Sequence, residues 1–167
     1  INDQVLFLRN LNKPTFNRLK IRLDSSFKSE SWDLGKIFSF YGYSKYIDAT
    51  KRPLQSLLKK SCLSICTHNG TVYLETLSNN FPTIIFWDKR YNEIKPESEK
   101  YIQSLVDAGI LFFSPIEAAK QVNKIIYDLD SWWYSKDLQL TIKDFCQNFA
   151  RTSNDWDDKW CNFFNKL

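Results

Sequence analysis

The alternation of apolar and polar positions is clearest over residues 62–88, where it predicts a strand, a helix and a second strand. Residues 63–66 form a short apolar run, and residues 83–86 form another that is rich in β-branched side chains. Between them, residues 71–79 carry apolar side chains at helical spacing, and Pro82 prevents that helix from continuing. Strands joined by a crossover helix are expected to be parallel, with a right-handed connection.

The loop between the first strand and the helix carries candidate binding residues, Asn69, Gly70 and Thr71. Asn and Gly tolerate positive φ, so the segment is typical of a turn. Free backbone N–H groups at the start of a helix, at the carboxyl edge of a sheet, favour anions such as diphosphates. An ordinary helix-capping loop would have the same sequence. His68, the chain's single histidine, would contact a phosphate, transfer a proton or simply pack beside the strand end.

The remaining pattern predicts further strands and helices in alternation. The predicted strands cover residues 4–9, 43–48 and 110–113, and residues 24–43 are expected to be an irregular connection. Predicted helices cover residues 13–23, 97–108, 115–126, 137–149 and a terminal tail over 150–167, with a short helix near Pro53 and a turn over 130–133. Gly109 is expected to end one helix, and Ser114, Pro115 and Glu117 to begin the next. About five strands alternating with helices predict one α/β domain, a Rossmann-like three-layer α/β/α fold with a mostly parallel sheet.

Composition narrows the function classes. The formal charge of +4 is mild and the lysines are scattered along the chain, which does not favour nucleic-acid binding. Four cysteines and one histidine without a CxxC pair do not form a common zinc site, so no metal is expected and the cysteines are interpreted as free thiols of a cytoplasmic protein. There is no apolar run of membrane-spanning length and no secretory signal. The first residue is Ile and Met is absent, which indicates a piece of a longer chain.

A set of short motifs resembles a known family. Residues 67–88 resemble the donor-side segment of GT-B glycosyltransferases, and the second half of the chain is similar to bacterial surface-polysaccharide transferases first named in Leptospira. The motifs that carry this resemblance are Phe86-Trp87, Gly109, Ser114-Pro115 with Glu117-Ala118-Ala119, Ser131-Trp132-Trp133, and Phe149-Ala150-Arg151-Thr152-Ser153. Each motif alone is weak, and the combination is fairly specific.

The resemblance implies a function for the whole protein. The chain would be the C-terminal, donor-binding half of a GT-B enzyme of cell-surface polysaccharide or lipopolysaccharide synthesis. Its partners would be a nucleotide-sugar donor, a glycan or lipid-linked acceptor and an N-terminal domain that supplies any catalytic base. The isolated fragment would not turn over, and the full protein would work in the cytoplasm, at the inner face of the membrane if it associates with it.

Further site residues follow from the predicted strand ends and from the resemblance. Glu75 lies one turn after Thr71 on the same helix face, and the resemblance implies contact with the nucleotide ribose. Trp87 and Arg90 follow the second strand, where they would stack on a base or sugar and neutralise a phosphate. Arg9 is expected at the carboxyl end of the predicted strand 4–9. For each residue, a solvated or core position is the alternative.

Two other functions stay open at this point. The domain could be a non-catalytic ligand-binding or protein-interaction module that docks through its aromatic tail. It could also be a phosphotransferase or epimerase, because a fold does not determine the reaction.

Overall fold

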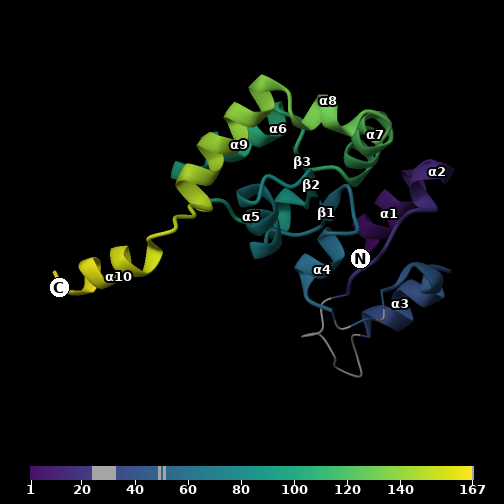
Figure 1. Ribbon diagram of the computed structural model, residues 1–167. Helices are drawn as coiled ribbons and strands as arrows, with labels where there is room; N and C mark the ends of the chain where they lie inside the picture. Colours follow the sequence, from purple (N-terminus) through teal and green to yellow (C-terminus); the bar gives the residue numbers. More distant parts are fainter. Residues whose placement is uncertain (24–32, 49, 51, 167) are drawn as a thin grey trace.

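The computed structural model describes residues 1–23, 33–48, 50 and 52–166, which are centred on a three-stranded parallel sheet of order β1-β2-β3 (Figure 1). The strands are β1 (Ser64–Cys66), β2 (Thr83–Phe86) and β3 (Leu111–Phe112). Ile84 of β2 pairs with Ile65, and Ile85 pairs with Leu111. Every residue of β2 is buried, as expected for a central parallel strand that is covered on both faces.

Helices cover both faces of the sheet. Successive side chains of β2 point to opposite faces, so they belong to two different core clusters. Ile84 and Phe86 belong to a core cluster with residues of α1 (Asn2–Asn10) and α7 (Pro115–Ile125). Ile85 and Trp87 belong to a second cluster with residues of α5 (Thr71–Ser78), α6 (Glu99–Asp107) and α9 (Lys136–Phe149). The α/β class predicted from the sequence is therefore confirmed.

The other helices are short. They are α2 (Lys13–Phe16), α3 (Leu34–Phe40), α4 (Leu54–Leu58), α8 (Leu129–Trp133) and α10 (Trp156–Phe164), with the 3₁₀ helices η1 (Ser44–Tyr46), η2 (Lys89–Tyr91) and η3 (Pro96–Ser98). The last helix, α10, stands away from the body of the molecule at the end of the segment that follows α9 (Figure 1). Within the described residues, no helix combines the length and the apolar character that crossing a membrane requires.

The strand–helix–strand unit and several predicted helix ends are confirmed. β1, α5 and β2 follow one another, and the two strands are parallel. Gly109 has φ of 69°, the left-handed conformation expected after α6. Ser114 accepts a hydrogen bond from the Glu117 amide at 3.4 Å, and Pro115 is the first residue of α7. Glu117 forms an ion pair with Lys120 at 2.8 Å.

The expectation of about five strands is wrong, and the largest difference lies at residues 4–9. This segment is helix α1, with Val5, Phe7 and Leu8 buried and Leu6 39% exposed. A short apolar run does not distinguish a buried strand from one turn of a buried helix, because both place apolar residues next to each other. Arg9 consequently lies in the last turn of a helix and not at a strand end.

The predicted strand 43–48 and helix 13–23 are also corrected. The first is η1 followed by a single parallel bridge between Ile47 and Ile21. The second stops at Phe16, because Ile21 is drawn into extended pairing: its N–H donates to the Tyr46 carbonyl at 2.7 Å and its carbonyl accepts from the Asp48 amide at 2.8 Å. The predicted turn 130–133 lies within helix α8. The irregular connection expected over 24–43 lies partly outside the described residues, and its later part holds α3.

Candidate functional site

The three parallel strands bring their following loops to one edge of the sheet. Residues 67–70 follow β1, residues 87–90 follow β2 and residues 113–114 follow β3. In open parallel sheets this carboxyl edge is where ligands bind. Most of the predicted site residues lie in these loops or in the first turns of the helices that follow them.

The start of α5 is the centre of this edge. Gly70 is its N-cap residue and, within the described residues, no side chain caps the helix. The first-turn N–H groups of α5 therefore have no side-chain acceptor, and they add to the positive end of the helix dipole. Thr71 is exposed at this position, and Glu75 is exposed one turn further along.

The side chain of His68 approaches Gly70 closely. The φ of −133° and ψ of −175° at Gly70 are extended, so Gly70 does not use the tolerance of positive φ that makes glycine common in turns. A Cβ at this position would lie 2.6 Å from Nε2 of His68. The imidazole of His68, itself exposed, thus lies against the N-cap of α5, where it can contact whatever binds the helix end.

The first turn of α1 also lies at this edge. Gln4 Nε2 donates to Thr67 Oγ1 at 2.7 Å, directly after β1. At the other end of α1, Asn123 of α7 accepts from the Asn12 amide at 2.9 Å and donates to the Asn10 carbonyl at 2.8 Å. The helices α1 and α7 therefore run side by side in the same direction, and the N-termini of α1, α5 and α7 all point to the carboxyl edge. Sequence reasoning missed Gln4 because it assigned residues 4–9 to a strand.

Arg90 lies at the edge but is already paired. Its Nη2 is 2.6 Å from Oδ2 of Asp88 and its Nε is 3.0 Å from Oδ1. Hydrogen bonds from Arg90 lower the pKa of Asp88, and the Asp88 carboxylate raises the pKa of Arg90, with a smaller contribution from Asp3 of α1. The Arg90 side chain remains 80% exposed, so an anion that competes with Asp88 can reach it.

Trp87 is a core residue, only 3% exposed. Its ring lies between Tyr73 of α5, at a centroid distance of 5.7 Å, and Phe113 after β3, at 6.5 Å. Stacking of Trp87 on a base or sugar does not fit this burial. Its Nε1 has no hydrogen-bond partner among the described residues. The hydroxyl of Tyr73 donates to Asn69 Oδ1 at 3.0 Å, so the core beneath the edge also holds the loop side chain.

Arg9 is the predicted site residue that the structure separates from the others. Its guanidinium carbon lies 5.8 Å from the ring centroid of Tyr41, which follows α3. It is about 7 Å further along α1 than Gln4, because an α-helix rises roughly 1.5 Å per residue. The Arg9 side chain therefore does not belong to the group at the carboxyl edge.

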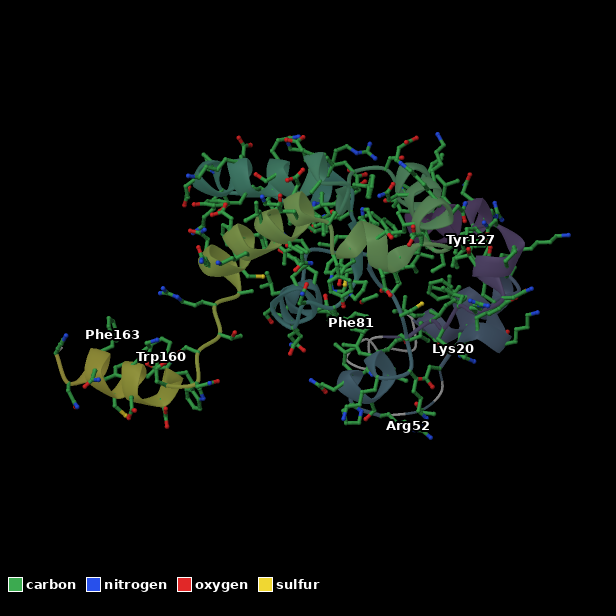
Figure 2. The ribbon with its side chains drawn as sticks, turned by 45° about the horizontal axis from the view of Figure 1, so that its top comes forward. Lys20, Arg52, Phe81, Tyr127, Trp160 and Phe163 are labelled. Carbon is green, nitrogen blue, oxygen red and sulfur yellow. The ribbon has the colours of Figure 1, made fainter. Side chains whose placement is uncertain are left out.

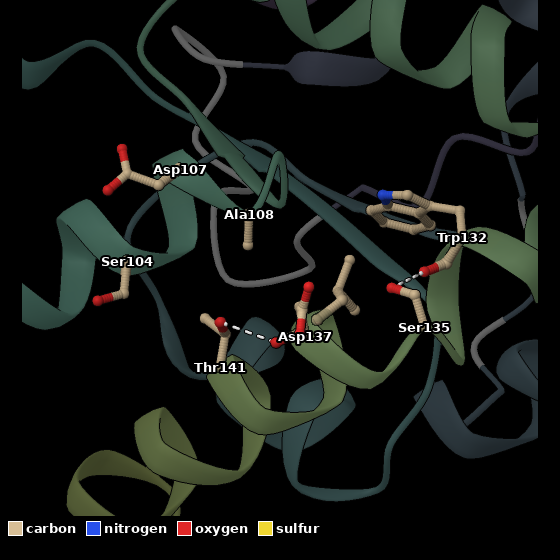
Figure 3. A pocket seen from close by; sticks show the side chains of 8 residues that line it. Ser104, Asp107, Ala108, Trp132, Ser135, Asp137 and Thr141 are labelled. Carbon is tan, nitrogen blue, oxygen red and sulfur yellow. Dashed lines mark hydrogen bonds between the residues drawn. The ribbon is translucent and has the colours of Figure 1, made fainter.

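One hollow near this edge and a larger one away from it border the second half of the chain. The larger, of about 450 Å³, lies between the end of α6 and the start of α9, at the end of the sheet where β3 begins (Figure 3). It is lined by Ser104, Asp107, Ala108, Trp132, Ser135, Asp137, Leu138 and Thr141. The smaller, of about 310 Å³, is bordered by Lys89 and Phe113, which follow β2 and β3. Lys89 Nζ lies 5.6 Å from the Phe113 ring centroid, so the ammonium group of Lys89 lies near the candidate site.

The comparison with protein families identifies the chain over almost its full length. The model of the LIC12162 family transferases matches residues 1–164. No curated protein and no solved structure matches the chain. The match confirms the transferase family that the motifs of the second half resemble. The chain therefore belongs to the LIC12162 family of transferases.

Proposed function

We propose that the chain is the nucleotide-sugar-binding domain of a GT-B-like glycosyltransferase of cell-surface polysaccharide synthesis. In this proposal the fold is Rossmann-like and forms the C-terminal half of the enzyme, and the acceptor is a glycan or a lipid-linked glycan. The transferase family and the parallel sheet with helices on both faces support it.

The observation that carries the proposal is the uncapped start of α5 at the carboxyl edge. A diphosphate placed there would accept hydrogen bonds from the first-turn N–H groups, and its charge would be stabilised by the dipole. The N-termini of α1 and α7 would add to the same field. In sugar transfer the leaving group is a nucleoside diphosphate, so donors fixed before the reaction stabilise the charge that develops.

Side chains around α5 would complete the donor site. His68 lies against Gly70 and would contact the diphosphate, as would the hydroxyl of Thr71. Glu75, one turn along the exposed face, would accept from the ribose hydroxyls. Arg90 would exchange part of its contact with Asp88 for the phosphate. The catalytic base would come from another domain of the enzyme, and the protein would act in the cytoplasm.

A second candidate function is supported by the tail. In α10, Trp156, Trp160, Phe163 and Phe164 are each between 54% and 64% exposed. Large apolar side chains that gather on an exposed helix are typical of interaction surfaces. The alternative is thus a protein-interaction module whose crevice binds no nucleotide.

The proposal is tested by thermal shift against UDP-, GDP-, CMP-, dTDP- and ADP-linked sugars and the free nucleotides. One nucleotide series should raise the midpoint of unfolding, because a ligand that binds only the folded state stabilises it. Thr71→Pro should abolish that shift. Proline at the first helical position keeps the helix but removes the Thr71 N–H, and the extended Gly70 before it is compatible with proline.

Thr71→Ala is the matched control, since it removes the hydroxyl and keeps the N–H. We expect it to retain most of the shift. Equal shifts in Thr71→Pro and the unmodified chain would contradict a diphosphate site at α5. No shift with any nucleotide, together with a stable complex through α10, would favour the interaction module.

A further inference from the structure

Charge is divided unevenly along the chain. Residues 1–60 hold 12 Lys and Arg against 5 Asp and Glu, whereas residues 61–167 hold 11 against 14. The overall charge of +4 is therefore the sum of a basic first third and a slightly acidic remainder. A field of one sign over one part of the surface attracts partners of the opposite sign.

Four exposed cations form a basic cluster, which we define as Lys20, Arg22, Lys45 and Arg52. The bridge between Ile21 and Ile47 brings the segment of Lys20 and Arg22 beside the segment of Lys45. Arg22 Nη1 donates to the carbonyl oxygen of Arg52 at 2.8 Å, which ties the fourth residue to the other three. Lys20 and Arg52 lie on the same side of the molecule, away from α10 (Figure 2).

The carboxylate of Asp48 lies near two of the four cations and offsets part of their charge. Among the described residues, no carboxylate forms an ion pair with any of the four cations. The Thr50 hydroxyl and amide donate to Asp48 at 2.9 and 3.0 Å, and these hydrogen bonds, with a smaller contribution from the charges of Arg52 and Arg22, lower the pKa of Asp48. Four exposed cations beside this carboxylate leave a net positive surface for an anionic partner.

An exposed aromatic side chain lies in the same part of the fold as the cluster. Phe40, at the end of α3, is 85% exposed, and α3 contacts η1, which contains Lys45. Cations and an exposed aromatic ring on neighbouring elements match the headgroup and acyl boundary of a bilayer, where charge and apolar area both contribute to binding.

We propose that the basic cluster and Phe40 dock the protein on an anionic lipid bilayer. The cations would lie at the phosphate level and Phe40 would insert at the acyl boundary. Each cation near such a surface raises the partition constant about fivefold. This proposal does not depend on the donor site, because none of these residues lies at the carboxyl edge.

The test is co-sedimentation of the full chain with vesicles of phosphatidylglycerol mixed with phosphatidylcholine, and with vesicles of phosphatidylcholine alone. Binding is expected only to the anionic vesicles and should weaken as salt is added. The triple variant K20Q/K45Q/R52Q should lower the partition constant by about 100-fold on the same fivefold scale. Phe40→Ala should lower it several-fold without changing the fold, since the ring is exposed.

The matched control is K124Q/K136Q/K143Q, which removes the same charge from exposed lysines of α7 and α9. This control should bind nearly as the unmodified chain does. An equal loss in both triple variants would show that net charge alone acts, and would overturn the proposal. Equal binding to the neutral vesicles, or tighter binding to duplex DNA or RNA than to anionic vesicles, would overturn it as well.

Discussion

Asn80 offers a sharp test of what holds the central strand–helix–strand unit to the helices around it. It follows α5 with φ of 49°, so it occupies the left-handed region. Its Oδ1 accepts from Nε1 of the fully buried Trp133 at 3.0 Å and from Nε2 of Gln139 at 3.0 Å, and its Nδ2 donates to Oε1 of Gln139 at 3.0 Å. One side chain thereby joins the turn before β2 to α8 and α9.

The cost of Asn80→Ala has two parts. The left-handed conformation costs an alanine about 1 kcal/mol. The lost hydrogen bonds cost about 1 to 2 kcal/mol in total, because each net bond is modest. The Trp133 indole would keep the backbone carbonyl of residue 80, at 3.1 Å, as an acceptor, which limits this loss. We therefore expect a loss of about 2 to 3 kcal/mol, or roughly 4–12 °C in the midpoint of thermal unfolding for a chain of this size.

Asn80→Gly separates the two parts, because glycine adopts positive φ freely but makes no side-chain bonds. We expect it to be about 1 kcal/mol more stable than Asn80→Ala. Urea unfolding followed by tryptophan fluorescence measures both variants. Equal stability of the two variants would contradict a cost of the left-handed conformation for alanine. Stability equal to that of the unmodified chain in both variants would contradict a contribution from the Asn80 hydrogen bonds.

Three further outcomes are expected. Burial raises the pKa of the Cys66 thiol to about 11, so iodoacetamide near neutral pH should modify the exposed Cys161 and leave Cys66 unmodified until the chain unfolds, as mass spectrometry would show. The hydrogen bonds from Arg90 lower the pKa of Asp88 below 3.8, so the stability that this pair contributes should be present above that pH and lost as the pH falls further. The free energies of unfolding of Asp88→Asn and the unmodified chain, measured during acid titration, should therefore converge at low pH. Because this variant also frees Arg90, it should bind nucleoside diphosphates more tightly. Ending the chain after Ser153 should leave the unfolding midpoint within about 2 °C, because the apolar side chains of α10 are largely exposed; a larger fall would show that the tail packs on the body.

Local signals in the sequence were sufficient for most elements from residue 62 onward, although the turn predicted over 130–133 lies within α8. Pro82, Gly109 and Pro115 mark helix ends through restrictions on their own backbone, which tertiary contacts do not alter. The apolar run of β2 is rich in β-branched residues and follows directly after Pro82, which together indicate a buried strand. The order β1, α5, β2 and the site loop at the start of α5 therefore followed from the sequence.

The first third of the chain was not predictable in the same way. Residues 4–9 carry adjacent apolar side chains, and only the contacts of α1 with α7 determine that they form a helix. Ile21 leaves the helical pattern because it pairs with residues more than twenty positions later. As a result Arg9 was placed at the wrong edge, and Gln4, which does lie at the carboxyl edge, was not found.

The most direct test of a donor site at the start of α5 is to map the backbone amides that respond to a nucleoside diphosphate. We would record ¹H–¹⁵N correlation spectra of the 19.8 kDa chain while adding UDP, GDP, CDP, dTDP or ADP. If the donor binds at the start of α5, one of these diphosphates should shift the amides of Gly70, Thr71 and Val72 most strongly, with smaller changes at Arg90. Shifts concentrated around Ser104 and Asp137 at the opposite end of the sheet, or none with any diphosphate, would contradict a donor site at the start of α5.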